Sequence, residues 1–438
     1  MTNLPSNNDN QNSANSPFLA EFIDRGFFQQ ATHFNELDKL ATKEKLITYI
    51  GFDCTAKSLH IGSLLQIMVL RLLQKHHHQV IILLGGGTTK IGDPSGKDES
   101  RQVLSEEQIN ENLNGIKKTL SQFISFEGEN KAIIVNNDNW LAKLNYIEFL
   151  RDIGKYFSIN RMLSFDSVKL RLDRDQPLSF LEFNYMILQA FDFYQLNQNY
   201  GCNLQIGGSD QWGNIINGVE LVRKINASKP VDKQNQHSTY GLTTPLMTTA
   251  DGKKMGKTAN GAVWLSAEML SPFDYFQYFR NIADDDVIRF LKLFSEISLE
   301  EINKMSNWQN QELNQAKEIL AFEATKICHG EAEAINALNQ ASAIFSNKNI
   351  NAFIEKSVTK LINCKITEII KEIGETASLS EAKRLIEGKA VKLNQQIVTD
   401  FNYIITAQDL EQEDSSQNIL LQIGKKKFFQ IKCHNDNI

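Results

Sequence analysis

A short segment near the N-terminus combines residue types that can bind a phosphate group. Residues 51–63 contain two glycines, a threonine and a histidine, with His60 and Gly62 near the end. A β-branched and aromatic run before it, residues 46–50, predicts a buried strand, and the apolar spacing of residues 64–75 predicts a helix. A helix N-terminus offers unpaired N–H groups and partial positive charge, and a glycine lets a ligand approach the backbone. The segment therefore indicates a phosphate site, although an ordinary strand–loop–helix connection has the same pattern.

A second group of polar residues is expected on one face of a helix. Tyr185, Gln189 and Asp192 are four and three residues apart, in a helix predicted over residues 183–195 that is otherwise largely apolar. The stripe either faces solvent or is buried for a purpose. A buried carboxylate needs a hydrogen-bond partner, and a ligand hydroxyl would suit Asp192.

Two glycine-rich loops follow predicted strands. Residues 85–97 come after a strand at residues 79–84, and residues 207–214 come after one at residues 204–206. The strand–helix–strand order of residues 46–84, which leads into the first loop, predicts parallel strands joined by a right-handed crossover. Parallel α/β sheets bind ligands at the carboxyl ends of their strands, so both loops are candidates for a ligand site. The first loop lacks the GxxxxGK[ST] spacing of a P-loop, and a plain turn is its alternative reading.

A lysine-rich segment at residues 253–258 (KKMGKT) could close on a polyphosphate. Its lysines and hydroxyl lie beside a glycine, and such groups can neutralise charge that develops during a reaction. A solvated surface loop would have the same composition.

Length and composition limit the classes of protein that fit. A chain of 438 residues is long enough for roughly two to four domains. The longest apolar runs are too short to span a membrane, and five scattered cysteines without a CxxC pair indicate a reducing cytoplasm and no structural zinc. The three consecutive histidines, residues 76–78, point in different directions on a helix, which favours a solvated helix end over a metal site. The net charge of −6 requires local basic patches for any RNA ligand.

The sequence predicts an α/β chain of several parts. Residues 1–17 are rich in Asn and Ser and predict a disordered tail without a signal peptide. We expect a Rossmann-like parallel-sheet domain, a helical domain, a linker and a small α+β domain, over residues 18–260, 261–345, 346–364 and 365–438 respectively. In the last part, a capping box opens a helix, and basic residues gather there that could contact a phosphate backbone: Lys383, Arg384, Lys389 and Lys392. A charged, solvated helix face is the plainer reading.

Four motifs, in a matching order, resemble those of class I aminoacyl-tRNA synthetases. His60-Ile61-Gly62-Ser63 is similar to the HIGH signature, and the lysine-rich segment to KMSKS in the form Lys254-Met255-Gly256-Lys257-Thr258. The wider context YxGFDxTAxSLH, residues 49–60, resembles the bacterial tyrosyl-tRNA synthetases. The resemblance runs from about residue 18 onward. It implies that the helical domain binds the anticodon, that an insertion at about residues 105–200 forms a homodimer, and that the last domain resembles an RNA-binding module of a small-subunit ribosomal protein.

The resemblance also implies a two-step reaction in the cytoplasm. The carboxylate of L-tyrosine attacks the α-phosphorus of Mg²⁺-bound ATP, giving tyrosyl-adenylate and pyrophosphate, and the tyrosyl group passes to the 3′ end of tRNA(Tyr). Phosphate-side roles fall to Thr55, His60, Lys97, Arg101, Lys254, Lys257 and Thr258. Tyr49 and Asp192 would bind the phenolic hydroxyl. The rest of tyrosine would contact Asp53, Asp93, Tyr185, Gln189 and Gln211, and the nucleotide would contact Gly51, His60, Gly62, Gly208, Asp210 and Lys257. No protein-bound metal is implied.

Two residues depart from the family pattern. Ser63 replaces the second histidine of HIGH, and Ile50 stands where some members have a ribose-binding cysteine. We expect an active enzyme, because neither change removes a phosphate contact. The alternatives are a tryptophanyl-tRNA synthetase of the same fold, a catalytically inactive RNA-binding relative, and a plain nucleotide-binding module, which would not account for Tyr185, Gln189 and Asp192.

Overall fold

The structure is a computed structural model that divides into two units, Met1–Ile335 and Asn336–Ile438. The residues it describes are 14–95, 104–230, 238–248, 255, 257–258, 261–346, 354–358, 360–394, 396–406, 409–413, 416–424 and 427–433. Lys97, Arg101 and Lys254 lie outside these ranges, as does most of the tail expected at residues 1–17.

A six-stranded sheet forms the centre of the first unit. Its order is β1-β6-β5-β2-β3-β4, with β1 antiparallel at one edge and the other strands parallel. The strands are β1 (Gln30–Ala31), β2 (Ile47–Asp53), β3 (Gln79–Gly85), β4 (Ile133–Asn136), β5 (Leu204–Gly208) and β6 (Tyr240–Thr244). The chain moves outward from β2 through β3 to β4 and then returns to the other side of β2 for β5 and β6. This order places a topological switch point between β2 and β5.

Strand β2 is longer than the sequence pattern predicts. The strand expected to end at residue 50 continues to Asp53, because Gly51 and Asp53 remain paired with Leu83 and Gly85 of β3. Alternate residues face opposite sides of a sheet, so Tyr49 shares its side with Asp53. Tyr49 packs there against Phe193, with ring centroids 5.4 Å apart. The extension carries Asp53 from the expected loop to the end of a strand.

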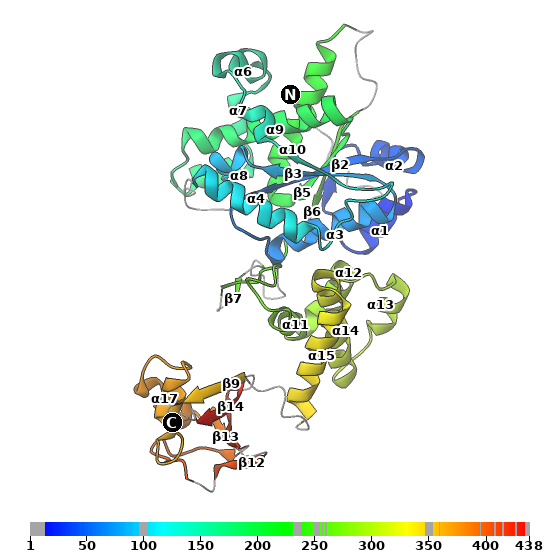
Figure 1. The fold of residues 1–438 in the computed structure, drawn as a ribbon. Coiled ribbons are helices and arrows are strands. Elements are labelled where there is room, and N and C mark those ends of the chain that lie inside the picture. Colours follow the sequence, from blue (N-terminus) through cyan, green and yellow to red (C-terminus); the bar gives the residue numbers. More distant parts are fainter. Residues whose placement is uncertain are drawn as a thin grey trace. The chain divides into compact units, whose positions relative to one another are not determined.

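Helices cover both faces of this sheet. In Figure 1, α9 (Phe180–Tyr200) and α10 (Trp212–Ala227) lie on one face, and α3 (Ile61–Lys75) lies on the other with α1 (Pro17–Asp24). A capping box of Ser179 and Glu182 opens α9, and Gly201 ends it in a left-handed conformation at φ 67°. Two further helices of this unit are α2 (Phe34–Lys43) and α4 (Glu106–Leu120).

The histidine triplet after α3 is not a solvated helix end. His76 pairs with Glu21 at 2.8 Å, and the buried ring of His78 accepts the backbone N–H of Leu46 at 3.1 Å. Burial lowers the pKa of His78 to about 4. Only His77 is exposed. The helical periodicity ended at residue 75, and a left-handed turn at His77 (φ 60°) redirects the chain into β3.

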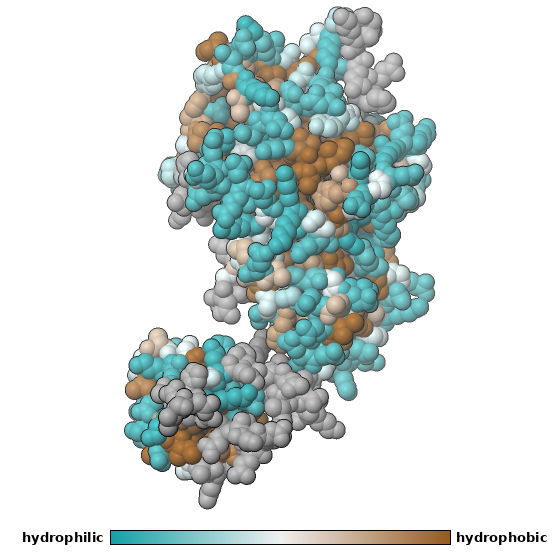
Figure 2. Space-filling model, viewed as in Figure 1, coloured by the Kyte–Doolittle hydropathy of each residue, from teal (hydrophilic) through white to brown (hydrophobic). Residues whose placement is uncertain are grey.

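Short helices form an insertion between β4 and α9. They are α5 (Asp138–Leu141), α6 (Tyr146–Asp152), α7 (Ile159–Leu163) and α8 (Asp166–Asp173). Several large apolar side chains are exposed there and at the start of α9, among them Ile147 at 68%, Ile159 at 59% and Phe180 at 70%. Figure 2 shows hydrophobic residues at the outer end of this insertion, where Figure 1 places α6.

Helices α11 to α15 follow the sheet, as the sequence predicts. They are α11 (Pro272–Arg280), α12 (Val287–Phe294), α13 (Leu299–Met305), α14 (Gln311–His329) and α15 (Glu331–Ser346). The buried guanidinium of Arg25 ties the N-terminal helix to this part, because it donates to the carbonyls of Lys292, Ser295 and Ile297 at 3.0 to 3.1 Å. Three backbone acceptors on one arginine fix α1 against the end of α12.

The second unit is a small α+β domain. Its helices are α16 (Ile366–Glu372) and α17 (Leu379–Glu387), and its strands are β9 (Ile354–Val358), β10 (Val391–Leu393), β11 (Gln396–Ile397), β12 (Glu411–Glu413), β13 (Ser416–Ile423) and β14 (Lys427–Cys433). The stretch 346–364, expected to be a linker, contains β9, which pairs in parallel with β14. This strand is short and its partner lies about seventy residues later, so no local pattern marks it. No helix among the described residues is long and apolar enough to cross a membrane.

Candidate active site

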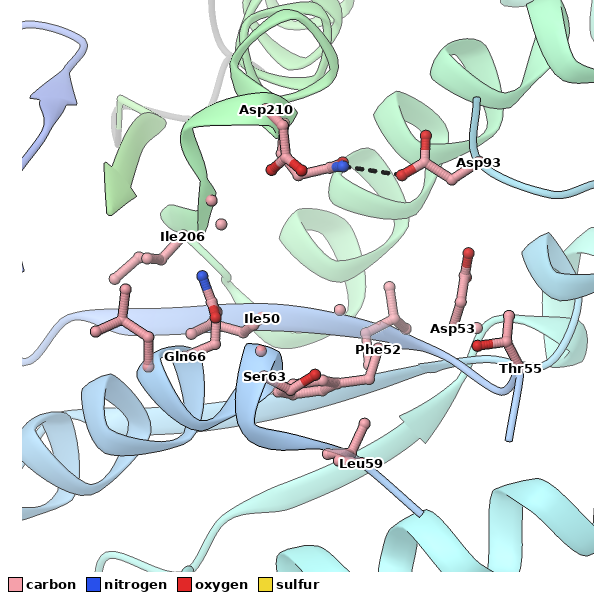
Figure 3. Close-up of a pocket in the computed structure, with 18 of the residues that line it drawn as sticks. Ile50, Phe52, Asp53, Thr55, Leu59, Ser63, Gln66, Asp93, Ile206 and Asp210 are labelled. Carbon is pink, nitrogen blue, oxygen red and sulfur yellow. Dashed lines mark hydrogen bonds between the residues drawn. The ribbon is translucent and has the colours of Figure 1, made fainter. Parts of the chain in front are cut away.

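A cavity of about 320 Å³ opens at the carboxyl ends of β2 and β5, where the strand order reverses. This is where an open α/β sheet is expected to bind a ligand, and the volume lies in the range of small-molecule sites. Figure 3 shows side chains from β2, the start of α3 and the loop after β5 facing this space. Residues predicted from the sequence that line it are Tyr49, Gly51, Asp53, Thr55, His60, Gly62, Asp93, Tyr185, Gln189, Asp192, Gly208, Asp210 and Gln211.

Five further residues were predicted to act on the phosphate groups. Lys97, Arg101 and Lys254 fall outside the described residues. Lys257 and Thr258 form the short strand β7 (Lys257–Thr258), which pairs with β8 (Gly261–Ala262). Met255, within the same segment, is buried and lines the cavity. Within this segment, it is therefore Met255 that lies beside the cavity.

Asp192 is buried at the inner end of the cavity. Its carboxylate accepts the Nδ2–H of Asn137 at 2.9 Å and the indole N–H of Trp140 at 2.7 Å. Burial raises the pKa of Asp192 to about 7, against the lowering effect of these two hydrogen bonds. The Tyr49 hydroxyl is also buried and has no hydrogen-bond partner among the described residues. An orphaned hydroxyl near a carboxylate is a site that a ligand hydroxyl can complete.

A hydrogen-bonded chain joins Asp192 to the mouth of the cavity. Asn137 donates to Thr88 Oγ1 at 3.0 Å as well as to Asp192, and Thr88 donates to Asp53 Oδ1 at 2.8 Å. The hydroxyl of Tyr185 donates to the other oxygen of Asp53 at 3.0 Å. Two carboxylates of one cavity are thus oriented by one network. Such an arrangement favours a ligand with a cationic group at one end and a hydroxyl at the other.

A second network orients the polar residues after β5. Gln211 donates to Asp93 Oδ2 at 2.8 Å, the dashed line in Figure 3. Asp93 Oδ1 accepts the backbone N–H of Ser95 at 2.9 Å. Asn214 donates to Gln211 Oε1 at 3.1 Å and to Gln189 Oε1 at 3.0 Å. Asp93, Gln189 and Gln211, all predicted from the sequence, are therefore held in fixed orientations before any ligand binds.

His60 caps the helix that points at the cavity. Its Nδ1 accepts the backbone N–H of Gly62 at 2.9 Å, which satisfies one of the unpaired donors at the start of α3. A Cβ atom at Gly62 would lie 2.6 Å from Cε1 of this ring, so any larger residue would displace the histidine. Gly62 therefore leaves room for the ring of His60 as well as for a ligand.

Sequence reasoning missed several residues of the cavity. Asn137 and Thr88 follow strands β4 and β3 at their carboxyl ends, and the same rule that selected the glycine-rich loops would have selected them. Gln66, one turn beyond Ser63 on α3, lines the cavity and donates to Thr244 Oγ1 at 3.0 Å. No pattern in the sequence indicates Trp140.

The four residues of the second unit that were predicted to bind RNA lie within one stretch, residues 383–392. Lys383 lies over the ring of Phe401 at 3.9 Å, and 3.7 Å from Glu387. Arg384 on α17 and Lys389 after it are exposed, and Lys392 is half-buried on β10. Lys389 has a left-handed backbone (φ 54°) that turns the chain from helix to strand. Arg384 and Lys389 therefore offer the more accessible charges of the four.

Comparisons with known proteins agree with this architecture. Residues 41–346 match the family of class I tRNA synthetases for tryptophan and tyrosine, and residues 368–410 match the S4 domain. A tyrosine--tRNA ligase of Rickettsia bellii is 51% identical over 95% of this chain and 99% of its own length, and one of Ehrlichia ruminantium is 53% identical over 95% and 98%. A C-terminally truncated mitochondrial tyrosyl-tRNA synthetase of Aspergillus nidulans superposes with a TM-score of 0.67 at 32% identity, covering 75% of this chain and 94% of its own. The chain therefore belongs to the class I tRNA synthetases, and within them to the tyrosine--tRNA ligases.

Proposed function

We propose that this protein activates L-tyrosine with ATP and transfers the tyrosyl group to tRNA(Tyr). The observation that carries the choice of amino acid is the buried end of the cavity. There Asp192 lies near the hydroxyl of Tyr49, which has no hydrogen-bond partner in the part of the chain that the structure describes. A phenolic O–H can donate to the carboxylate and accept from Tyr49. Phenylalanine would leave these buried groups unpaired, which is costly; tyrosyl-tRNA synthetase is itself a standard example of that discrimination.

In this proposal the amino acid lies along the two hydrogen-bonded networks. Asp93, Tyr185 and Gln189 would hold the ammonium group, with Asp53 close by and Gln211 near the carboxylate. The carboxylate is already ionised at neutral pH, so it needs no protein base to attack the α-phosphorus. Catalysis would then consist of positioning the reactants and stabilising the charge that develops.

The nucleotide would extend across the mouth of α3. Gly51, Gly62, Gly208 and Asp210 would face the adenosine, and Thr55 and His60 the far end of the triphosphate. Lys97, Arg101, Lys254, Lys257 and Thr258 would neutralise the departing pyrophosphate. We propose that Mg²⁺ arrives with ATP, because Mg²⁺ at such sites is held largely by phosphates and water. Among the described residues, no group of three or more His, Cys, Asp or Glu could hold a metal ion.

The second unit would contact the tRNA. The support is its match to the S4 domain and the exposure of Arg384 and Lys389 on a protein with a net charge of −6. Lys383 and Lys392 belong to the same proposal. Replacing Arg384 and Lys389 with Ala should weaken tRNA binding and reduce the dependence of that binding on salt, because fewer counterions are released. Unchanged salt dependence would contradict this assignment.

We further propose that the protein is a cytoplasmic homodimer joined through the insertion. The support is the set of exposed apolar side chains on α6, α7 and the start of α9, since monomeric proteins rarely expose large apolar patches. Sedimentation of the full chain should give twice the monomer mass, and Ile147→Asp together with Ile159→Asp should give monomers. A wild-type chain that sediments as a monomer at micromolar concentration would overturn the proposal.

The direct test of the whole function is aminoacylation. Purified protein, ATP, Mg²⁺ and labelled tyrosine should charge tRNA(Tyr), and labelled tryptophan should not be transferred to any tRNA. Charging with tryptophan instead would show that the family assignment is right and the amino acid wrong. The absence of charging together with retained tRNA binding would favour a purely RNA-binding role.

A further inference from the structure

The chain that leaves the lysine-rich segment pairs antiparallel with the HIGH-like signature. The backbone N–H of Ile61 donates to the carbonyl of Val263 at 2.8 Å, and the N–H of Leu265 donates to the carbonyl of Leu59 at 3.0 Å. One residue of each paired segment lies between these two hydrogen bonds. In an antiparallel pair, residues enclosed in this way face each other without a hydrogen bond between them, and their side chains come closest.

The two residues enclosed by these bonds are His60 and Trp264. Their ring centroids are 6.1 Å apart at an interplanar angle of 69°, an edge-to-face arrangement. Such aromatic pairs are favourable beyond the area they bury, and they have a preferred orientation. The indole of Trp264 therefore restricts the rotation of the imidazole from one side.

A different contact fixes which nitrogen of His60 carries the proton. Because Nδ1 accepts the N–H of Gly62, the neutral ring carries its proton on Nε2, which makes Nε2 the hydrogen-bond donor of this side chain. A donor at this place can bind a phosphate oxygen only if the ring is held at the correct angle. The helix cap sets the tautomer, and Trp264 restricts the angle.

The segment that carries Trp264, just after β8, is itself firmly held. Val263 and Leu265 on either side are 4% and 0% exposed. The carbonyl of Leu265 also accepts a hydrogen bond from the thiol of Cys328 at 3.4 Å, which ties this segment to the end of α14. Trp264 follows Lys257 by only seven residues, so the residue paired with His60 lies close in the chain to the lysine-rich segment.

We propose that Trp264 is a positioning residue for His60 in the activation of tyrosine. It holds the imidazole so that Nε2–H points at the triphosphate, and it acts on the reaction only through that ring. The inference rests on the proposed activation of tyrosine by ATP. It assigns to Trp264, a residue outside both signatures, the orientation of the histidine in the first signature.

The test is a double-mutant cycle in tyrosine-dependent ATP–pyrophosphate exchange. Trp264→Leu should lower kcat about 10-fold or more with the KM for tyrosine unchanged, since a misplaced catalytic contact can cost up to about 100-fold. Trp264→Phe should keep most of the activity, because it retains an aromatic edge. In a His60→Ala background, Trp264→Leu should cause no further loss.

Several outcomes would overturn the proposal. One is an equal loss of rate from Trp264→Leu with and without His60, since that would mean the tryptophan does not act through the imidazole. Another is a loss as large for Trp264→Phe as for Trp264→Leu.

If Trp264→Leu melts well below the wild type, Trp264→Met replaces it in the same cycle. Trp308→Leu, at a half-buried tryptophan on the loop before α14, is the matched control and should leave kcat unchanged. Failure of the wild type to exchange would instead contradict the proposed function.

Discussion

The indole N–H of Trp140 donates to Asp192 Oδ1 at 2.7 Å, although Trp140 lies on α5, the first helix of the insertion, and Asp192 lies on α9, which follows the insertion. With Asn137 on the other oxygen, this bond orients a carboxylate that burial would otherwise favour in its protonated form. The pair sets the charge at the inner end of the cavity. It thereby links amino acid recognition to pH.

Tyrosine recognition is expected to depend on pH near neutrality. Burial raises the pKa of Asp192 to about 7, so in the free protein the carboxyl group loses its proton as the pH rises through that value. The ionised form is the stronger acceptor for a phenolic O–H. The KM for tyrosine in pyrophosphate exchange should therefore fall between about pH 6 and pH 8. Asp192→Asn should raise this KM and remove the dependence; an unchanged profile in that variant would assign the titration to another group.

Replacing Trp140 with Phe should move that profile to higher pH. The variant keeps the aromatic ring but loses the hydrogen bond that lowers the pKa of Asp192, so the carboxyl group should ionise later. The measurement is the midpoint of the KM profile for tyrosine. Trp308→Phe is the control because Trp308 lies in the helical part of the chain. A midpoint that stays in place, or moves to lower pH, would contradict the role given to this bond.

The sequence predicted more of the residues that line the cavity than of the residues that hold those side chains in place. Strand ends and glycine-rich loops follow from local patterns, and the stripe of Tyr185 and Asp192 follows from helical spacing. Asn137 and Trp140 lie about fifty residues before Asp192, and only the fold brings them together. Strand β9 was missed for the same reason, since its partner β14 is distant in the chain.

Helix α4 should not tolerate a methyl group at Gly115. A Cβ atom there would lie 1.9 Å from the carbonyl oxygen of Lys57, in the loop that carries Thr55. Alanine in a helix is usually more stable than glycine by about 1 kcal/mol, but overpacking against backbone costs about 1 to 3 kcal/mol or more. Gly115→Ala should therefore lower the free energy of unfolding in urea. Gly154→Ala, whose Cβ would meet Leu150 at an ordinary 3.6 Å, should be close to neutral; a stabilised Gly115→Ala would show that α4 moves away at no cost.

The lysine-rich segment should act on the transition state and not on amino acid binding. Lys257→Ala should lower the rate of adenylate formation about 100-fold to 1,000-fold, the usual effect of removing one group that stabilises developing charge. The dissociation constant for tyrosine should not change, because the side chain meets the leaving pyrophosphate. Stopped-flow measurement of both quantities separates them. Lys304→Ala, at an exposed residue on α13 paired with Glu300, is the control. A large loss of tyrosine affinity would contradict the role.

We expect this cavity to activate tyrosine and to select it by its hydroxyl group. The most direct measurement is ATP–pyrophosphate exchange by the full-length protein with tyrosine, phenylalanine and tryptophan in parallel, using Asp192→Asn beside the wild type. Exchange that depends on tyrosine alone, with selectivity over phenylalanine reduced in the variant, is the result this account predicts. Exchange with tryptophan, or equal selectivity in the wild type and Asp192→Asn, would contradict it.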